Sequence, residues 1–450
     1  MEEVRKFLER LREEYNIPSI SCGIYSDGEK KTLVVGNADE EDKEKATKDT
    51  FYCIGSCTKS FTALAILNLC SKGKLELTNS PTEYIEELPS LFGEVTIEHL
   101  LSHSSGIPSD SIAEVIVEEE FGIGEYDYEL DTYEGFLNYL NQNTVNSTFS
   151  PGEKKLYYNS GYTILGMVIS EVSGKSYEEF VQEEILSALE MRKSGFNKSK
   201  NESGVAKPYR LTEDELEERT IPSGPVFNPA GGLFLNATEA AGYVSFLVAG
   251  RFKKNELISS SLSEDLTRSR IDASPGASVS NEGNYCLGLY ETEFLGNTAY
   301  CHGGVVQSSS AGIAFDDEDG VMIMTNSNTP FYPSNIAFAI FSILKGHSPD
   351  KVPFFSLNKK LKSLEGTYSD EAEVWKFEVE ESHPYLKLSL QSDVEPFKTK
   401  IEPDNYKTDN LKFWSRSENG ERNPSPIEFN EEDGNKVFYH LGHRFERKNQ

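Results

Sequence analysis

The sequence has few basic residues for its length of 450: 44 Lys and Arg stand against 74 Asp and Glu, a formal net charge of −30. This balance excludes a nucleic-acid-binding protein, because phosphate requires a basic face. It also disfavours docking on anionic lipid. Long apolar runs are missing as well, since the longest, from Ile336 to Leu344, is too short to span a bilayer.

Paired cysteines are also absent: none of the six cysteines forms a C-x-x-C pair, and most lie among apolar residues. Such thiols are typical of a buried core. The N-terminus lacks the basic and apolar regions of a secretory signal and shows an amphipathic helix pattern instead. One face of that pattern carries Val4, Phe7, Leu8, Leu11 and Tyr15. We therefore expect a soluble, cytoplasmic protein with reduced thiols.

Strand-like runs occur near both ends of residues 1–346. Residues 19–25 and 31–35 flank a hairpin turn, and glycine-bounded runs return between 284 and 325. Helical and loop material lies between them, including a mostly apolar helix over 60–69. The order predicts one sheet built from both ends of this segment, with a helical insertion.

The character of the sequence changes after this segment. Residues 347–358 contain two prolines and no periodic pattern, which predicts a linker. Short alternating runs separated by turn residues fill 359–450, and they predict a small antiparallel barrel or sandwich.

A serine and a lysine, Ser56 and Lys59, stand three residues apart at the start of the expected helix. This spacing puts both side chains on one helix face. A serine hydroxyl is a poor nucleophile until a base removes its proton, and a lysine can act as that base if its pKa is lowered. The alternative is a purely structural pair, with a serine that caps the helix and an exposed lysine.

Two further segments carry polar groups suited to the same chemistry. Tyr157 could move protons, and Asn159 could hold a substrate carbonyl. In His302-Gly303-Gly304, glycines allow a substrate backbone to approach closely, and exposed N–H groups could bind an oxyanion. The alternative for the Tyr157 segment is an aromatic strand or turn with a capping Asn159, and the alternative for the His302 segment is a plain turn.

Taken in order, these segments resemble the serine β-lactamase-like superfamily of class C β-lactamases, penicillin-binding proteins, D-aminopeptidases and esterases. The resemblance covers residues 5–345. It extends to Asp49-Thr50-Phe51, to residues 96–106, which look like I-x-x-L-L-x-H-x-S-G, to Pro229-Ala230-Gly231-Gly232-Leu233, and to the run from Gly320 to Asn326. The implied fold is an α/β (α+β) sandwich with an antiparallel sheet and a helical insertion.

The resemblance also implies a role for each matching residue. Ser56 would be the acylated nucleophile, and Lys59 its activating base. Tyr157 would protonate the leaving group and then activate the hydrolytic water, and Asn159 would bind the substrate amide. The backbone N–H groups of Ser56 and Val305 would form the oxyanion hole. No metal or cofactor is implied.

One position departs from the superfamily pattern. His302-Gly303-Gly304 stands where penicillin-binding proteins and β-lactamases have K-T-G, and the resemblance implies that this segment binds substrate. The usual lysine helps to hold a substrate carboxylate, which a neutral imidazole does less well. The H-x-G form looks like that of D-aminopeptidases and CubicO hydrolases of peptidase family S12. Together with the lack of a class A deacylation glutamate, it argues against a β-lactamase.

The C-terminal segment opens on Leu364-Glu365-Gly366-Thr367-Tyr368. It resembles the lipocalin-like domain of archaeal CubicO peptidases. In those enzymes the domain assembles a self-compartmentalising octamer, and the enzymes cleave peptides that contain D-amino acids. The resemblance implies a homo-oligomer, with residues 359–450 assembling an octamer. A domain that shapes the substrate cleft and a barrel that binds a hydrophobic ligand are the alternatives.

Two remaining features stand near these motifs. His99 and His103 are spaced i, i+4, but Leu100 replaces the Glu of the zinc motif H-E-x-x-H, so we expect packing or hydrogen bonding instead of metal binding. Residues 114–134 carry nine acidic and no basic residues. We hypothesise that this insertion favours substrates with a free amine, and a solvated loop is the alternative.

The sequence therefore predicts a serine hydrolase, needing neither metal nor cofactor, that acts on small peptides with D-amino acids. A small peptide or ester is the expected substrate, with no nucleic-acid or membrane partner. A carboxylesterase of the same fold is one alternative, and a catalytically silent scaffold is another.

Overall fold

A computed structural model describes most of the chain, and it forms two compact units, Met1–Gly346 and His347–Gln450. No helix in the described ranges is long and apolar enough to cross a membrane. The described residues are 1–112, 115–116, 130–143, 146–212, 215–250, 257, 264–274, 283–382, 385–391, 397–403, 412–416, 422–423, 425–432, 434–440 and 442–448.

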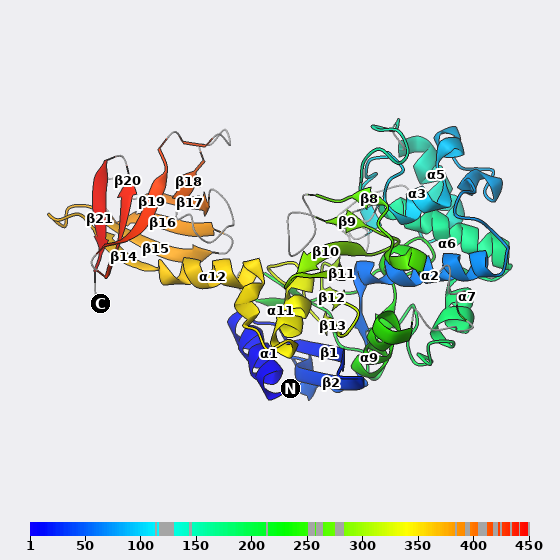
Figure 1. Cartoon of the computed structure of the whole chain (residues 1–450), viewed down its shortest axis with the longest axis horizontal. Helices are drawn as coiled ribbons and strands as arrows, with labels where there is room; N and C mark the ends of the chain where they lie inside the picture. The colour runs from blue at the N-terminus through cyan, green and yellow to red at the C-terminus, as the bar shows by residue number, and fades with distance from the viewer. Residues whose placement is uncertain are drawn as a thin grey trace. The chain divides into compact units, whose positions relative to one another are not determined.

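The first unit is built on a nine-stranded antiparallel sheet in the order β3-β2-β1-β13-β12-β11-β10-β9-β8 (Figure 1). The N-terminal strand β1 pairs with the late strand β13, so both ends of the segment join in one sheet, as the sequence predicts. The strands are β1 Ser19–Ser26, β2 Glu29–Asp39, β3 Glu44–Lys45, β8 Ile271–Asp272, β9 Asn284–Tyr285, β10 Tyr290–Phe294, β11 Asn297–Val306, β12 Ser309–Phe315 and β13 Gly320–Thr325.

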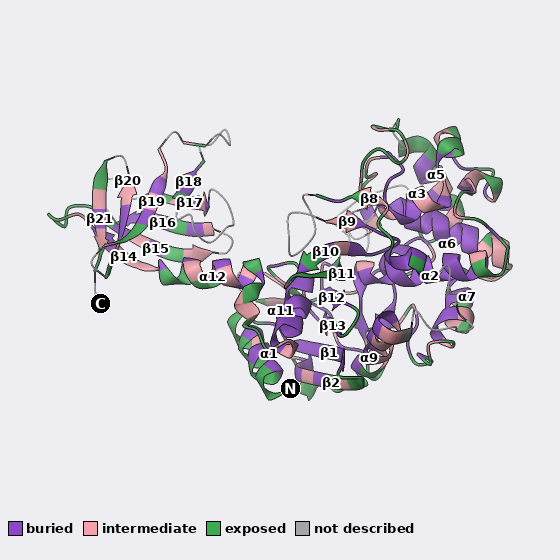
Figure 2. Ribbon diagram, viewed as in Figure 1, coloured by how far each residue is buried: buried purple, intermediate pink, exposed green. Residues whose placement is uncertain are grey.

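Helices cover both faces of this sheet. A Cβ on Gly23 would lie 2.4 Å from the backbone N of Ala241 in α9, and a Cβ on Gly312 would lie 2.6 Å from the start of α11. Gly23 pairs with Met322 and Gly312 with Ile323. Successive residues on β13 point to opposite faces, so α9 and α11 lie on opposite sides, and β12 and β13 are buried throughout (Figure 2).

A helical region is inserted between the two sets of strands. Its central helix, α2, is buried along most of its length, which explains the continuous apolar pattern that the sequence shows there. The α-helices that the structure describes in the first unit are α1 Glu2–Glu14, α2 Thr58–Ser71, α3 Ile97–Leu101, α5 Tyr133–Asn143, α6 Asn159–Ser173, α7 Tyr177–Phe180, α8 Asn228–Gly231, α9 Ala237–Ser245 and α11 Ser334–Leu344. Two small two-stranded sheets pair β4 Tyr52–Cys53 with β7 Phe234–Leu235, and β5 Tyr209–Leu211 with β6 Leu216–Glu218.

The second unit contains a closed barrel of eight strands that follow one another around it. The strands are β14 Gly366–Ser369, β15 Lys376–Ser382, β16 Tyr385–Gln391, β17 Phe397–Pro403, β18 Lys412–Ser415, β19 Ile427–Glu432, β20 Asn435–His440 and β21 His443–Arg447. Alternating side chains meet inside as one hydrophobic cluster rich in aromatic rings. The sequence predicts this architecture but misses β17 and β21.

The segment expected to be a linker, 347–358, is partly helical. A 3₁₀ turn covers Pro349–Lys351, and α12 covers Pro353–Ser363. Leu357, Leu361 and Leu364 join the hydrophobic cluster of the barrel. Their i, i+4, i+7 spacing is helical, but it begins at the end of the predicted linker and continues beyond it.

Candidate active site

Ser56 lies in the 3₁₀ turn Gly55–Cys57 that leads directly into α2. Gly55 has a φ of 51°, which favours glycine, and a Cβ there would lie 2.9 Å from the backbone N of Val305. A Cβ on Gly304 would lie 2.0 Å from the carbonyl of Ile54. The two glycines therefore let β11 press against the Ser56 turn, and this contact brings the predicted Ser56 and Val305 segments together.

Lys59 is fully buried on the first turn of α2. Its Nζ lies 3.0 Å from Ser56 Oγ, 2.9 Å from Asn159 Oδ1 and 2.8 Å from the carbonyl O of Ala230. Burial lowers the pKa of the Lys59 amine to about 7. A large part of the lysine population is therefore neutral near pH 7.

Tyr157 and Asn159 flank Tyr158, the N-cap of α6. The Tyr157 ring faces Lys59, whose Nζ lies 5.1 Å from its centroid. Burial raises the pKa of Tyr157 well above 10, and a side-chain hydrogen bond with Ser56 offsets this only in part. The phenol is therefore protonated near neutral pH.

His302 is buried on β11, with both ring nitrogens engaged inside the protein. Its Nδ1 lies 2.7 Å from the carbonyl of Gly303, which can only accept, so Nδ1 carries the proton. Nε2 then accepts from the hydroxyl of Tyr285, 3.1 Å away. Burial, with Lys59 nearby, lowers the pKa of His302 to about 3. A substrate could therefore bind to the neutral imidazole only by replacing one of these two contacts.

The backbone of β11 offers a different kind of contact. β10 pairs with β11 only as far as Cys301, whereas β12 pairs along it to Val306. Among the described strands, no other one pairs with residues 302–306. This part of β11, which includes Gly303 and Gly304, is an edge that an extended peptide can join by main-chain hydrogen bonds.

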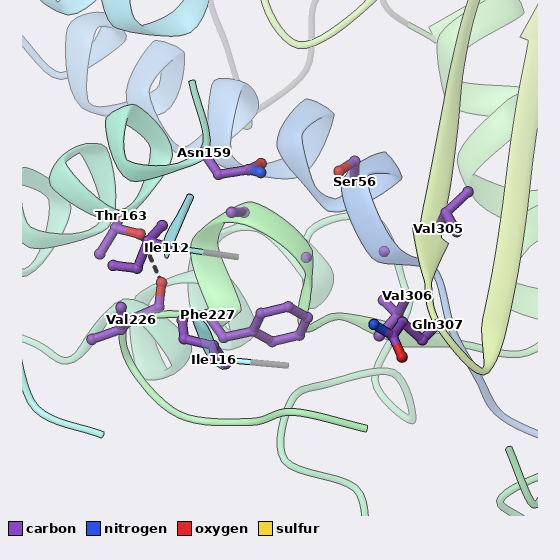
Figure 3. Close-up of a pocket in the computed structure, with 13 residues that line it drawn as sticks. Ser56, Ile112, Ile116, Asn159, Thr163, Val226, Phe227, Val305, Val306 and Gln307 are labelled. Carbon is purple, nitrogen blue, oxygen red and sulfur yellow. Dashed lines mark hydrogen bonds between the residues drawn. The ribbon is translucent and has the colours of Figure 1, made fainter. Parts of the chain in front are cut away.

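A cavity of about 230 Å³ opens beside Ser56 and Asn159 (Figure 3). Figure 3 shows Thr163 hydrogen-bonded to the carbonyl of Val226, at 2.7 Å, so this hydroxyl is satisfied. None of the thirteen described lining residues is charged. The lining consists of Gly55, Ser56, Ile112, Ile116, Asn159, Thr163, Val226, Phe227, Ala230, Gly231, Val305, Val306 and Gln307.

The two spaced histidines do not face a common ligand. His99 Nδ1 accepts the N–H of Thr96 in a capping box at the start of α3, whereas His103 is buried against Tyr157. Within the described residues, no group of three or more His, Cys, Asp or Glu side chains could hold a metal. The acidic insertion 114–134 lies largely outside the described residues.

Three residues that contact the site could not be identified from the sequence. The Ala230 carbonyl belongs to the recognised Pro229–Leu233 segment, but nothing in the sequence marks its bond to Lys59. Tyr285 and the lining residue Phe227 lie in segments that carry no motif. Of these three residues, only Ala230 could have been placed near the site, because it lies within a motif that matches the superfamily.

The fold and the site geometry, with a serine next to a buried lysine, are those of the β-lactamase fold. The chain belongs to the Beta-lactamase family, whose model matches residues 4–345. A second family model, the Pab87 octamerisation domain, matches residues 349–445.

Individual relatives agree with this assignment. Protein flp of Staphylococcus aureus strain N315 is 25% identical over 350 residues, which cover 74% of this chain and 64% of the relative. The chain thus spans less than two thirds of the length of that curated relative. The structure of the octameric penicillin-binding protein homologue from Pyrococcus abyssi matches 99% of both chains, with a TM-score of 0.87 and 29% identity. A penicillin-binding protein from Bacillus halodurans shares the fold, with a TM-score of 0.61 and 23% identity over 75% of this chain and 99% of that one.

Proposed function

We propose that this chain hydrolyses small peptides containing D-amino acids through an acyl-enzyme on Ser56. The position of Lys59 carries the proposal, because its buried amine, with a pKa of about 7, lies 3.0 Å from Ser56 Oγ. A neutral amine has two N–H donors and one lone pair. Asn159 Oδ1 and the Ala230 carbonyl accept the two N–H groups. The lone pair is then free to take the Ser56 proton.

The acylation step follows from these positions. Ser56 Oγ attacks the scissile carbonyl while its proton passes to Lys59, and the backbone N–H groups of Ser56 and Val305 bind the oxyanion. Tyr157 then donates its phenolic proton to the leaving amine as the C–N bond breaks, and the Lys59 ammonium restores that proton. In deacylation, the same groups remove a proton from the attacking water, and Ser56 leaves with a proton restored.

The apolar cavity beside Ser56 further restricts which substrate side chains can bind. Its described lining carries no charge, and the Thr163 hydroxyl is already bonded to Val226. A charged side chain would lose part of its hydration there, and none of the described lining residues offers a compensating charge. We therefore assign this cavity to an apolar side chain of the acyl residue. The preference for D-residues rests on the resemblance to CubicO peptidases.

A panel of aminoacyl amides tests this assignment. We expect kcat/KM for D-leucyl amide to exceed that for D-glutamyl amide by about 100-fold or more. The free energy needed to bury an unpaired carboxylate corresponds to at least about a 100-fold loss of binding. D-amides should exceed their L-counterparts. Turnover of p-nitrophenyl esters alone would support the carboxylesterase, and no turnover of any substrate by folded protein would support the scaffold.

A charge placed in the cavity provides the matched control. Ile116→Lys should raise the ratio of D-glutamyl to D-leucyl turnover, since the new cation lies in the cavity wall. Ser109→Lys adds the same charge to an exposed position of the same segment outside the lining, and it should leave that ratio unchanged. Equal ratios in both variants would contradict the assignment of the cavity to the acyl side chain.

We also propose that the chain assembles as an octamer through residues 359–450. The match of residues 349–445 to the Pab87 octamerisation domain supports a homo-oligomer. The barrel exposes two large apolar side chains, Val374 at 72% and Trp375 at 48%, in the turn before β15. Such side chains are typical of protein contact sites.

Since all six cysteines are free, we also propose a reducing compartment such as the cytoplasm.

Replacing both apolar residues tests the assembly. Val374→Ser combined with Trp375→Glu should shift the mass measured by light scattering from eight copies to a smaller species, because burying a carboxylate at an interface is unfavourable. Lys6→Glu, an exposed change on α1, should leave the mass unchanged. A monomeric wild-type chain would contradict the octamer, and an octameric double variant would place the interface elsewhere.

A further inference from the structure

His103 contacts the backbone on both sides of Tyr157. Its carbonyl accepts the N–H of Leu156 at 2.8 Å, and its ring Nδ1 accepts the N–H of Tyr158 at 3.1 Å. The two donors are the residues immediately before and after Tyr157. A single residue thus fixes the chain at both neighbours of the proposed proton donor.

The ring of His103 also packs directly on the phenol. The two ring centroids lie 4.1 Å apart with an interplanar angle of 34°. His103 is completely buried, and the rings of Tyr162 and Tyr285 enclose it at 5.2 and 4.9 Å. Backbone bonds and ring packing together leave the Tyr157 side chain little freedom to move away from Ser56.

The protonation state of His103 is consistent with these contacts. Because Nδ1 accepts the Tyr158 N–H, the proton of the neutral ring is on Nε2, and Nε2 has no hydrogen-bond partner within the described part of the chain. Burial, with Lys59, Lys155 and His302 nearby, lowers the pKa of His103 well below 6.5. The ring is therefore neutral at neutral pH and keeps its acceptor.

The loop that carries His103 is held against the segment that carries Tyr157. The N–H of Gly152 donates to the Ser104 carbonyl at 2.7 Å, and that of Thr148 donates to the Gly106 carbonyl at 2.8 Å. A Cβ on Gly106 would lie 1.9 Å from the Phe149 carbonyl. His103 itself has a φ of 56°, a left-handed conformation that is uncommon for residues other than glycine and that the surrounding contacts maintain.

We propose that His103 is a positioning residue, which holds the Tyr157 hydroxyl where it can protonate the leaving group. The inference rests on the proposed function, because it concerns a step of that reaction. His103 neither gives nor takes a proton in it. A metal-binding role does not fit, since His99 is engaged with Thr96 at the start of α3 and Nδ1 of His103 is engaged with Tyr158.

The dependence on the leaving group tests the proposal. An amine must be protonated to leave, whereas p-nitrophenolate leaves unaided. His103→Ala should slow acylation by a D-aminoacyl amide about 100-fold, but it should slow the p-nitrophenyl ester burst by less than about threefold. His103→Asn tolerates the left-handed backbone and keeps an acceptor, so it should recover part of the amide rate. Equal losses on both substrates would indicate a merely structural role and would overturn the proposal.

A double-mutant cycle separates this inference from the proposed function. If His103 acts through Tyr157, adding His103→Ala to Tyr157→Phe should change the amide rate by less than about twofold. Additive losses would contradict the inference while leaving acylation of Ser56 intact. If the wild-type protein forms no adduct at Ser56, the proposed function itself fails. His99→Gln, which preserves the α3 capping pattern, is the control and should behave as wild type.

Discussion

Replacing Ser56 with alanine is expected to lower kcat/KM toward a D-aminoacyl amide by about 10⁵–10⁶-fold. The proposed mechanism passes through a covalent bond to Ser56 Oγ, and neither Lys59 nor Tyr157 can supply that bond. Removing the hydroxyl takes away only a small, partly exposed group in the 3₁₀ turn before α2. Steady-state turnover of D-leucyl amide, wild type against variant, measures the loss.

The fold of this variant has to be preserved for the result to count. We expect its melting temperature to lie within a few degrees of wild type, because Ser56 contributes no apolar contact to the buried core. A variant that melts normally and keeps more than about 1% of the wild-type kcat/KM would contradict a covalent mechanism on this residue.

Replacing Lys59 with methionine is expected to slow acylation of Ser56 by about 10³–10⁴-fold, at the upper range for removal of a general base. The pH profile should change as well. The reactive form of Lys59 is the neutral amine with a pKa of about 7, so wild-type kcat/KM should rise with pH through about 7 and then level off. The variant lacks this titration, and its profile should be flat in that range.

Stability measurements provide the control for Lys59. Its pKa is about 7 in the folded state and 10.5 as the ordinary value, so between these pH values the unfolded chain binds a proton that the folded chain does not. Wild-type stability should therefore gain a favourable contribution as pH rises from 7 to 10.5, and Lys59→Met should lack it. A variant that retains the acid limb of activity would show that another group is the base.

Much of the site could be predicted from short-range patterns. The Ser56–Lys59 spacing places two side chains close together where the 3₁₀ turn Gly55–Cys57 leads into α2. The pairing of early with late strands follows from where the strand-like runs occur. These features depend on helix and strand periodicity, which the sequence displays directly.

Other features depend on tertiary partners that no local pattern reveals. The ring of His302 turns inward because Tyr285, 17 residues earlier, provides its partner. The lowered pKa of Lys59 requires burial, and its third contact comes from Ala230, 171 residues away. His103 similarly acquires its role only when the loop before Tyr157 packs on it. Burial and long-range contacts decide these properties, and spacing alone does not.

The most direct test of the acyl-enzyme is intact-protein mass spectrometry of the full chain mixed with a D-alanyl p-nitrophenyl ester and quenched in acid during the burst. The mechanism predicts one added D-alanyl group per chain, located on Ser56 by peptide mapping and absent from Ser56→Ala. Turnover of the ester without any adduct, or with the adduct on another residue, would contradict nucleophilic catalysis by Ser56.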